Sequence, residues 1–177
     1  MPISPTGRSR SEGGFTLVEL SVAALIIVVL AAVAAPSFAG FWRASQARNC
    51  AWQVAASARR ARDYAICHAV RVALEYDEAE RTFRLTAESD PTDASAGWQP
   101  LALAGAQPVS VPDAVEGVAL VIEGREAGFD SAVVFFPDGQ ALEAEIVLEG
   151  SQGVLSVTVA PLTGRSKVVE GDARTQK

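Results

Sequence analysis

The chain has 177 residues, of which 49% are hydrophobic and 20% are charged, and its formal net charge at pH 7 is −6. This length allows one ordinary domain with an appendage, and the acidic balance disfavours general nucleic-acid binding, because phosphate recognition needs a basic surface. The charge is unevenly distributed: residues 43–71 hold six arginines against one aspartate, net +5, whereas residues 72–177 hold 18 acids and 7 bases, net −11. The basic segment is therefore a candidate surface for lipid head groups or acidic neighbours.

The most apolar part of the chain is the run of 23 residues from Leu20 to Trp42, which contains no charged residue. As a helix this run would be about 35 Å long at roughly 1.5 Å per residue, enough to cross the hydrocarbon core of a bilayer. Arg8 and Arg10 precede it and predict a cytoplasmic N-terminus. We therefore expect a membrane helix with the rest of the chain on the opposite side of the membrane.

A cleaved secretory signal is the alternative interpretation of this run, because the small residues Ala32-Val33-Ala34 are typical of a cleavage site. Three features disfavour it. The basic leader ends in Gly13-Gly14 before the run, Glu19 lies inside the apolar segment, and the apolar character continues beyond Pro36. Because a signal that is removed needs none of these features, retention of the helix is the prediction.

The outer end of the run predicts two local features. Pro36 lacks an amide hydrogen and clashes with the preceding turn, so we expect a helix kink or a local loosening there. Phe38, Phe41 and Trp42 form an aromatic cluster typical of a membrane interface, and packing against neighbouring helices is equally compatible with them.

The stretch Gly13-Gly14-Phe15-Thr16-Leu17-Val18-Glu19-Leu20 closely resembles the processing site of type IV prepilins, which is shared by type IV pilins and the pseudopilins of type II secretion. The resemblance implies cleavage between Gly14 and Phe15 by a prepilin peptidase/N-methyltransferase, followed by N-methylation of Phe15. It also implies a single-pass protein of the bacterial inner membrane, with a cytoplasmic N-terminus and a periplasmic C-terminal domain.

Glu19 is the unusual residue of this helix, because a carboxylate at mid-membrane depth costs roughly 2.5–3.5 kcal/mol and needs a partner. In an assembled filament the positive N-terminal amine of an adjacent subunit supplies one, and the resemblance implies that this assembly salt bridge sets the register. The alternative is that Glu19 lies near enough to the interface to stay hydrated, or is protonated.

Beyond the apolar run, residues 43–68 continue the helix with a narrow apolar stripe of small residues at three- and four-residue spacing. The stripe consists of Ala47, Cys50, Ala51, Val54, Ala58, Ala61 and Ala65. Arg48, Arg59 and Arg62 lie off the stripe, so one face of this amphipathic half can pack closely on a sheet while the charged side faces solvent or other subunits.

The period then changes to two, which predicts strands. Val70, Val72, Leu74 and Tyr76 alternate with polar or small residues, a turn follows at 77–80, and Phe83 and Leu85 alternate again, which indicates a hairpin. Residues 88–97 are expected to be an exposed loop. Further strands are expected at 117–123, 131–136, 141–149, 153–160 and 165–169, with a turn at Asp138-Gly139 between two of them. Glu143 and Glu145 are expected to be exposed carboxylates of an acidic sheet.

These elements predict an α+β fold, in which a long N-terminal helix packs on a mainly antiparallel, pilin-like β-sheet domain. The helix comprises a membrane-spanning half and an amphipathic half. The expected parts are a prepilin leader at 1–14, a transmembrane and assembly half at 15–42, an amphipathic half at 43–68, a β-domain at 69–170 and a tail at 171–177.

The distal part also resembles the GspH/FimT group of minor pilins, which includes type II secretion system protein H and FimU. The resemblance is carried by Ala61-Arg62-Asp63-Tyr64-Ala65-Ile66, by Val134-Phe135-Phe136-Pro137-Asp138-Gly139 and by Gly164-Arg165-Ser166-Lys167-Val168. Together with the N-terminal motif it extends over most of the chain. A Pro-Asp-Gly turn alone is common in β proteins.

No constellation of catalytic residues is present in the sequence, so we expect no catalytic residue, no metal site, no cofactor and no enzymatic activity. The single histidine, His68, has no second histidine or Cys-x-x-Cys pair to complete a zinc site, and no nucleophile motif surrounds it. Asp90, Asp93 and Asp130 lack the spacing of an EF-hand loop. Cys50 and Cys67 would lie about 25 Å apart on a continuous helix, too far for a disulfide. Either the helix breaks between them or both are unpaired, and burial of both as small hydrophobic residues is the favoured expectation.

The resemblances imply a minor pseudopilin, a structural component of the type II secretion pseudopilus involved in protein secretion across the outer membrane. Its expected partners are the membrane, the prepilin peptidase/N-methyltransferase and other pseudopilins or pilins. The alternative is a minor pilin that initiates or caps a type IV pilus, with FimT-like DNA binding in natural transformation. Arg165 and Lys167 would then contact DNA, although lysine lacks the bidentate fork of arginine and the acidic surroundings disfavour nucleic acid.

Overall fold

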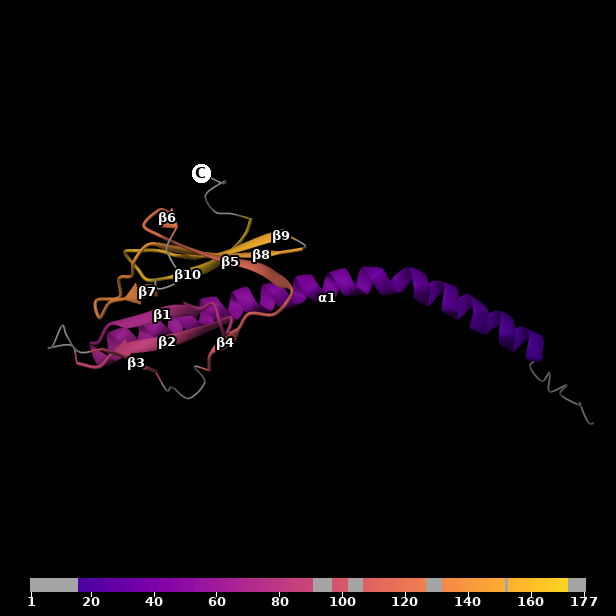
Figure 1. Ribbon diagram of the computed structural model, residues 1–177, viewed down its shortest axis with the longest axis horizontal. Coiled ribbons are helices and arrows are strands. Elements are labelled where there is room, and N and C mark those ends of the chain that lie inside the picture. The colour runs from indigo at the N-terminus through magenta and orange to yellow at the C-terminus, as the bar shows by residue number, and fades with distance from the viewer. Residues whose placement is uncertain (1–15, 91–96, 102–106, 127–131, 152, 172–177) are drawn as a thin grey trace, which may run out of the picture. The chain divides into compact units, whose positions relative to one another are not determined.

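The computed structural model describes residues 16–90, 97–101, 107–126, 132–151 and 153–171, and side chains at 33–37 and 39 lie outside the described part. The chain forms two compact units, residues 1–39 and 40–177. Among the described residues, one α-helix, α1 (Leu17–His68), contributes to both units, and ten strands follow it within the second unit (Figure 1). The α+β fold class predicted from the sequence is confirmed, and so is the end of the helix at His68.

The strands form two antiparallel sheets of five strands each. The first sheet has the order β3-β2-β1-β7, with β4 also paired to β2, and the second has the order β10-β9-β8-β5-β6. The strands are β1 (Val72–Asp77), β2 (Thr82–Glu88), β3 (Trp98–Pro100), β4 (Val109–Ser110), β5 (Val115–Ile122), β6 (Arg125–Glu126), β7 (Ala132–Phe135), β8 (Ala144–Gly150), β9 (Gly153–Val159) and β10 (Ser166–Glu170).

The predicted hairpin is present as β1 and β2, which pair from Val72↔Ala87 to Asp77↔Thr82. The Asp77 carboxylate accepts a hydrogen bond of 3.0 Å from the amide of Glu80 and so closes the turn. Tyr76 and Phe83 are directly opposite each other, with ring centroids 4.8 Å apart. Such cross-strand aromatic pairs stabilise a hairpin and fix its register.

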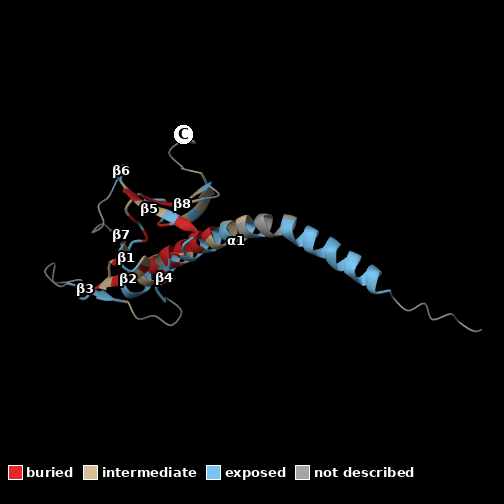
Figure 2. Cartoon of the chain, turned by 45° about the vertical axis from the view of Figure 1, so that its right-hand side comes forward, coloured by how far each residue is buried: buried red, intermediate tan, exposed pale blue. Residues whose placement is uncertain are grey.

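The core lies between the amphipathic half of α1 and both sheets. The predicted helical stripe is buried: Ala51, Val54, Ala58, Ala61 and Ala65 are inaccessible to solvent (Figure 2). They pack in one cluster with side chains of both sheets, including Leu74, Phe83, Phe135 and Ile146. Small residues on the helix allow this close approach, and the long side chains of the strands fill the remaining space.

The turn at Asp138-Gly139 is present, but it does not join neighbouring strands of one sheet. The amide of Gly139 donates to Phe136 O at 3.0 Å, and Gly139 has a φ of +85°, which glycine adopts without strain. A single bridge, Phe135↔Ala141, follows before the chain crosses from β7 in the first sheet to β8 in the second. The turn therefore connects the two sheets.

The structure corrects three other expectations. The short strands β3, β4 and β6 were not predicted, and Pro100 lies in β3 on the edge of its sheet, where a missing amide is tolerated. Glu88, expected to begin an exposed loop, is instead the last residue of β2 and is buried. Residues 91–96 of the expected loop lie outside the described part. Glu145 is 9% exposed and lies in the buried run Ala144–Leu148 of β8, whereas Glu143 is exposed as expected.

Candidate functional site

The helix begins with a cap that involves the carboxylate-bearing residue of the N-terminal motif. The amide of Glu19 donates to Thr16 Oγ1 at 3.2 Å, and the amide of Leu20 donates to Thr16 O at 3.1 Å. Thr16 Oγ1 thus satisfies one amide that the first turn leaves without a helical partner, while Thr16 O accepts the first helical bond. Glu19 places its negative charge at the positive end of the helix. Gly14 and Phe15, the predicted processing residues, lie outside the described residues.

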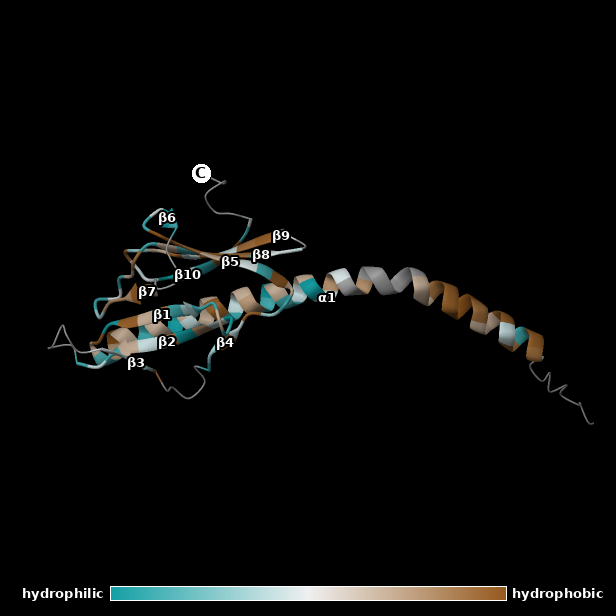
Figure 3. Ribbon diagram, viewed as in Figure 1, coloured by the Kyte–Doolittle hydropathy of each residue, from teal (hydrophilic) through white to brown (hydrophobic). Residues whose placement is uncertain are grey.

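The first half of α1 presents an apolar surface on all sides. Every residue from Thr16 to Ala32 is exposed, and the exposed fractions of large apolar side chains range from 51% at Val22 to 84% at Leu17. Most of this segment is hydrophobic (Figure 3). The Ser21 hydroxyl donates back to Leu17 O at 2.7 Å, so this polar group is satisfied within the helix. Glu19 forms no ion pair with any described residue. The apolar surface thus requires an environment from outside the unit.

Among the described residues, no helical segment is both long enough and apolar enough to cross a membrane.

The chain remains helical through Pro36, whose side chain lies outside the described part, so the predicted kink is untested. Phe38, Phe41 and Trp42 are 73%, 72% and 66% exposed. These aromatics therefore have the exposure that either a membrane interface or a neighbouring helix requires.

Two glycine turns meet the end of the amphipathic half of α1. A Cβ on Gly164 would lie 2.9 Å from Arg62 Cδ and 2.7 Å from Gly139 O, and a Cβ on Gly139 would lie 3.3 Å from Ile66 Cδ1. The three segments that carry the resemblance to the GspH/FimT group are therefore in mutual contact. Their glycines leave the space that Arg62 and Ile66 occupy.

A depression lies beside this contact, with a volume of about 290 Å³. We call it the arginine depression; it is lined by Arg59, Arg62, Asp63, Gly164, Arg165 and Ser166. Ser166 Oγ donates to Ala55 O at 2.8 Å and so ties the start of β10 to the helix. Of the two predicted DNA contacts, Arg165 lines the depression, whereas the exposed Lys167 lies one residue beyond its lining.

The positive charges that line the arginine depression are only partly paired with carboxylates of the described chain. Arg62 Nη1 is 3.8 Å from Asp63 Oδ1, beyond hydrogen-bond distance, and the Asp63 side chain is 70% exposed. Arg62 Nε is buried without a hydrogen-bond partner among the described residues. A buried donor of this kind costs about 1–3 kcal/mol. The grouping was missed from the sequence, where Arg59 and Arg62 were placed off the apolar stripe but not near Arg165.

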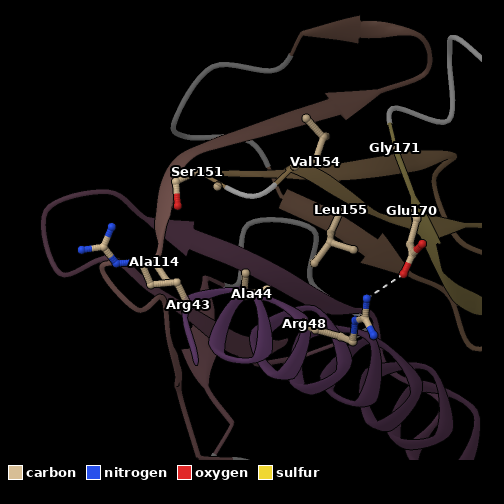
Figure 4. A pocket seen from close by; sticks show the side chains of 12 residues that line it. Arg43, Ala44, Arg48, Ala114, Ser151, Val154, Leu155, Glu170 and Gly171 are labelled. Carbon is tan, nitrogen blue, oxygen red and sulfur yellow. Dashed lines mark hydrogen bonds and ion pairs between the residues drawn. The ribbon is translucent and has the colours of Figure 1, made fainter. Parts of the chain in front are cut away.

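A second cavity, of about 320 Å³, lies between the start of the amphipathic half of α1 and the ends of β8, β9 and β10 (Figure 4). Arg48 Nη2 is 2.8 Å from Glu170 Oε1 on one side, and Arg43, Val154 and Leu155 also line the space. The side chains of Arg48 and Glu170 are 60% and 76% exposed, so their ion pair contributes little to stability.

Side chains with catalytic or redox chemistry are scattered. His68 is exposed and stacks on Tyr64, with ring centroids 3.8 Å apart. Cys50 and Cys67 are unpaired, and Cys50 is buried, but Cys67 is exposed, which corrects the expectation that both are buried. Cys67 lies two residues after Ala65 and so points away from the buried stripe. The described residues contain no group of three or more His, Cys, Asp or Glu side chains that could hold a metal; Asp93 and Asp130 lie outside them.

The helix, the two antiparallel sheets and the N-terminal segment define a type IV pilin-like protein. Residues 9–35 match the prokaryotic N-terminal methylation motif, and residues 51–164, well over half of the chain, match the family described as type II transport protein GspH. The chain therefore belongs to the GspH family of pilin-like minor pseudopilins.

Solved structures agree with this fold. The crystal structure of the minor pseudopilin EpsH from the type II secretion system of Vibrio cholerae is 12% identical, with a TM-score of 0.56 over 72% of this chain and 96% of that chain. The solution structure of Escherichia coli GspH is 16% identical, with a TM-score of 0.52 over 72% of this chain and 89% of that one. No curated protein sequence matches the chain significantly.

Proposed function

We propose that the protein is a minor pseudopilin that serves as a structural subunit of the type II secretion pseudopilus and takes part in protein secretion across the outer membrane. One combination of features supports this proposal. The chain carries a GspH domain and an N-terminal methylation motif, and the helix residues 16–32 within that motif are all exposed and largely apolar. Such a helix needs a membrane before assembly and neighbouring helices after it.

Processing and topology follow from the same motif. The prepilin peptidase/N-methyltransferase cuts between Gly14 and Phe15 and methylates the new amine of Phe15, so residues 1–14 are the leader. Residues 15–42 then lie in the inner membrane, with the leader in the cytoplasm and residues 43–177 in the periplasm. Arg8 and Arg10 before the uncharged run support this orientation.

Glu19 acts in assembly through its charge. Its carboxylate is exposed and forms no ion pair among the described residues. In the filament it pairs with the N-terminal amine of an adjacent processed subunit, which compensates the cost of placing a carboxylate in an apolar environment. Thr16 already caps the helix, so Glu19 is free to serve this intermolecular role.

The secretion role is tested by deleting the gene and restoring it in its native host. Extracellular proteins should decrease in the deletion strain and return with the wild-type chain, while surface piliation stays unchanged. Normal secretion together with a loss of pili, or of natural transformation, would contradict the proposal and support a minor pilin of a type IV pilus. The processed chain should also co-purify with the other pseudopilins of the same host.

A further inference from the structure

The arginine depression holds a guanidinium whose position is fixed by the fold. The Arg62 stem lies against Gly164, where even one added carbon would come within 2.9 Å of Cδ. The Arg62 side chain is 31% exposed, although its Nε is buried without a described partner. The desolvation of Arg62 Nε is therefore not offset by a hydrogen bond within the described chain. The rest of this partly exposed side chain is accessible to an acceptor from another molecule.

The charges around Arg62 leave the depression positive. It combines three arginines with one carboxylate, that of Asp63, which is largely exposed and 3.8 Å from Arg62. Arg59 and Arg165 form no ion pair with any described residue. The site therefore fits an anion that brings its own charge-assisted hydrogen bonds, and arginine forks suit carboxylates and phosphates.

We propose that the arginine depression binds a side-chain carboxylate from the acidic β-domain of an adjacent pilin-like subunit. This inference rests on the proposed function, because it requires subunits to meet in a filament. The chain itself shows the necessary complementarity: residues 43–71 carry a net charge of +5, and residues 72–177 carry −11. A neighbouring subunit with the same acidic balance would present carboxylates to these arginines.

A protein carboxylate fits these observations better than nucleic acid does. A duplex presents a continuous line of phosphates and requires an extended basic surface. Here three arginines converge on one depression of about 290 Å³, with Asp63 on its lining and an acidic domain around it. A depression of this size has room for a side-chain carboxylate, and the net charge of −11 over residues 72–177 disfavours the close approach of a nucleic-acid strand.

The test uses the full chain in detergent micelles and a fluorescent octaglutamate peptide as the probe. Wild-type protein should bind the peptide in a salt-dependent manner. Arg59→Glu and Arg165→Glu should each weaken binding about tenfold or more, since each loses a charge-assisted contact. Arg60→Glu is the matched control, because Arg60 is exposed on the same helix but does not line the depression, and its effect should stay within about twofold.

Arg62→Lys adds a test of geometry, because lysine keeps the charge and loses the fork. Its peptide affinity should fall while that of Arg60→Lys does not. If Arg62→Lys does not fold, the exposed Arg59 and Arg165 variants still decide the question. Failure of the wild type to bind the peptide, or equal losses in Arg59→Glu and Arg60→Glu, would overturn the proposal. Tighter binding of a short DNA duplex than of the peptide, abolished by Arg165→Glu, would also overturn it.

Two measurements in cells distinguish a wrong carboxylate site from a wrong proposed function. In cells, Arg59→Glu and Arg165→Glu should be cleaved after Gly14 like the wild type but should enter the filament less often than Arg60→Glu. Absence of processing in the wild type would refute the proposed function, whatever the peptide shows. Normal processing and equal filament entry of all three variants would refute only the carboxylate site.

Discussion

Gly164 and Arg62 are packed so closely that a Cβ on Gly164 would lie 2.9 Å from Arg62 Cδ. The same Cβ would lie 2.7 Å from Gly139 O, and the φ of Gly164 is +57°, a conformation that disfavours other residues. The contact joins β10 and the turn before β8 to the amphipathic half of α1. It also positions Arg62 in the arginine depression, so the packing of the fold and the proposed site depend on one glycine.

Gly164→Ala should therefore destabilise the protein by about 2–4 kcal/mol, the sum of backbone strain and overpacking. Thermal unfolding of the detergent-solubilised chain measures the effect. Gly97→Ala is the matched control, because no atom lies within 4 Å of the Cβ position on Gly97, and it should be nearly neutral. Equal stability of the two variants would show that the contact is looser than described.

The ion pair between Arg71 and Glu88 should make stability depend on pH. Arg71 donates two hydrogen bonds to the Glu88 carboxylate, whose side chain is 5% exposed, and these bonds lower the pKa of Glu88 from 4.5. A carboxyl group with a lower pKa in the folded chain stabilises it above the unfolded pKa, and the contribution is lost as the pH falls through the folded value.

Glu88→Gln should thus be less stable than the wild type at pH 7, and the difference should shrink on acidification below about pH 4.5. Denaturant titrations at a series of pH values give this difference. Glu116→Gln removes an exposed carboxylate on β5 and should give curves parallel to those of the wild type. A constant difference between Glu88→Gln and the wild type across this range would contradict the role of the pair.

The two cysteines should react very differently. Burial raises the pKa of the Cys50 thiol to about 11, whereas Cys67 is exposed near the end of α1. A thiol reagent at neutral pH should label Cys67 in the folded protein and reach Cys50 only after denaturation, because the thiolate is the reactive form. The pattern should be the same with and without prior reduction; labelling of neither thiol until a reductant is added would instead indicate a disulfide.

Glu19→Ala should separate insertion from assembly. Removal of a carboxylate makes the helix more apolar, so the variant should reach the membrane fraction as the wild type does. Entry into the filament should fall by about tenfold or more, since the intermolecular ion pair is lost. Cross-linking of assembled subunits gives the incorporated fraction, with Ser21→Ala as a control on the same exposed helix half. Unchanged incorporation of Glu19→Ala would refute the pairing.

The sequence predicted those parts of the fold in which a repeating pattern reflects one local environment. The three- and four-residue spacing of Ala47 to Ala65 corresponds to the buried face of α1, and the alternation from Val72 to Leu85 corresponds to the β1–β2 hairpin. Very short strands such as Arg125–Glu126 carry no period, because pairing with a neighbour is all that defines them.

Long-range contacts were not predictable in the same way. The Pro137-Asp138-Gly139 turn was recognised, but nothing local indicates that the chain then passes to a second sheet. Likewise, Arg59 and Arg62 lie one turn apart on α1, but Arg165 is about 100 residues further along the chain, and the packing of the Gly164–Ser166 segment on the helix brings it beside them. The burial of Glu145 was likewise not predictable, because it depends on what the tertiary fold places around β8 and not on the local sequence.

The central claim, a processed pilin-like subunit that retains its apolar helix, is tested most directly by mass spectrometry of the mature N-terminus from the membrane fraction. The account predicts a chain that begins with N-methylated Phe15. A chain that begins at Ala35 would instead show removal of a secretory signal and would contradict it, as would an unprocessed chain that begins at Met1 in a host with an active prepilin peptidase.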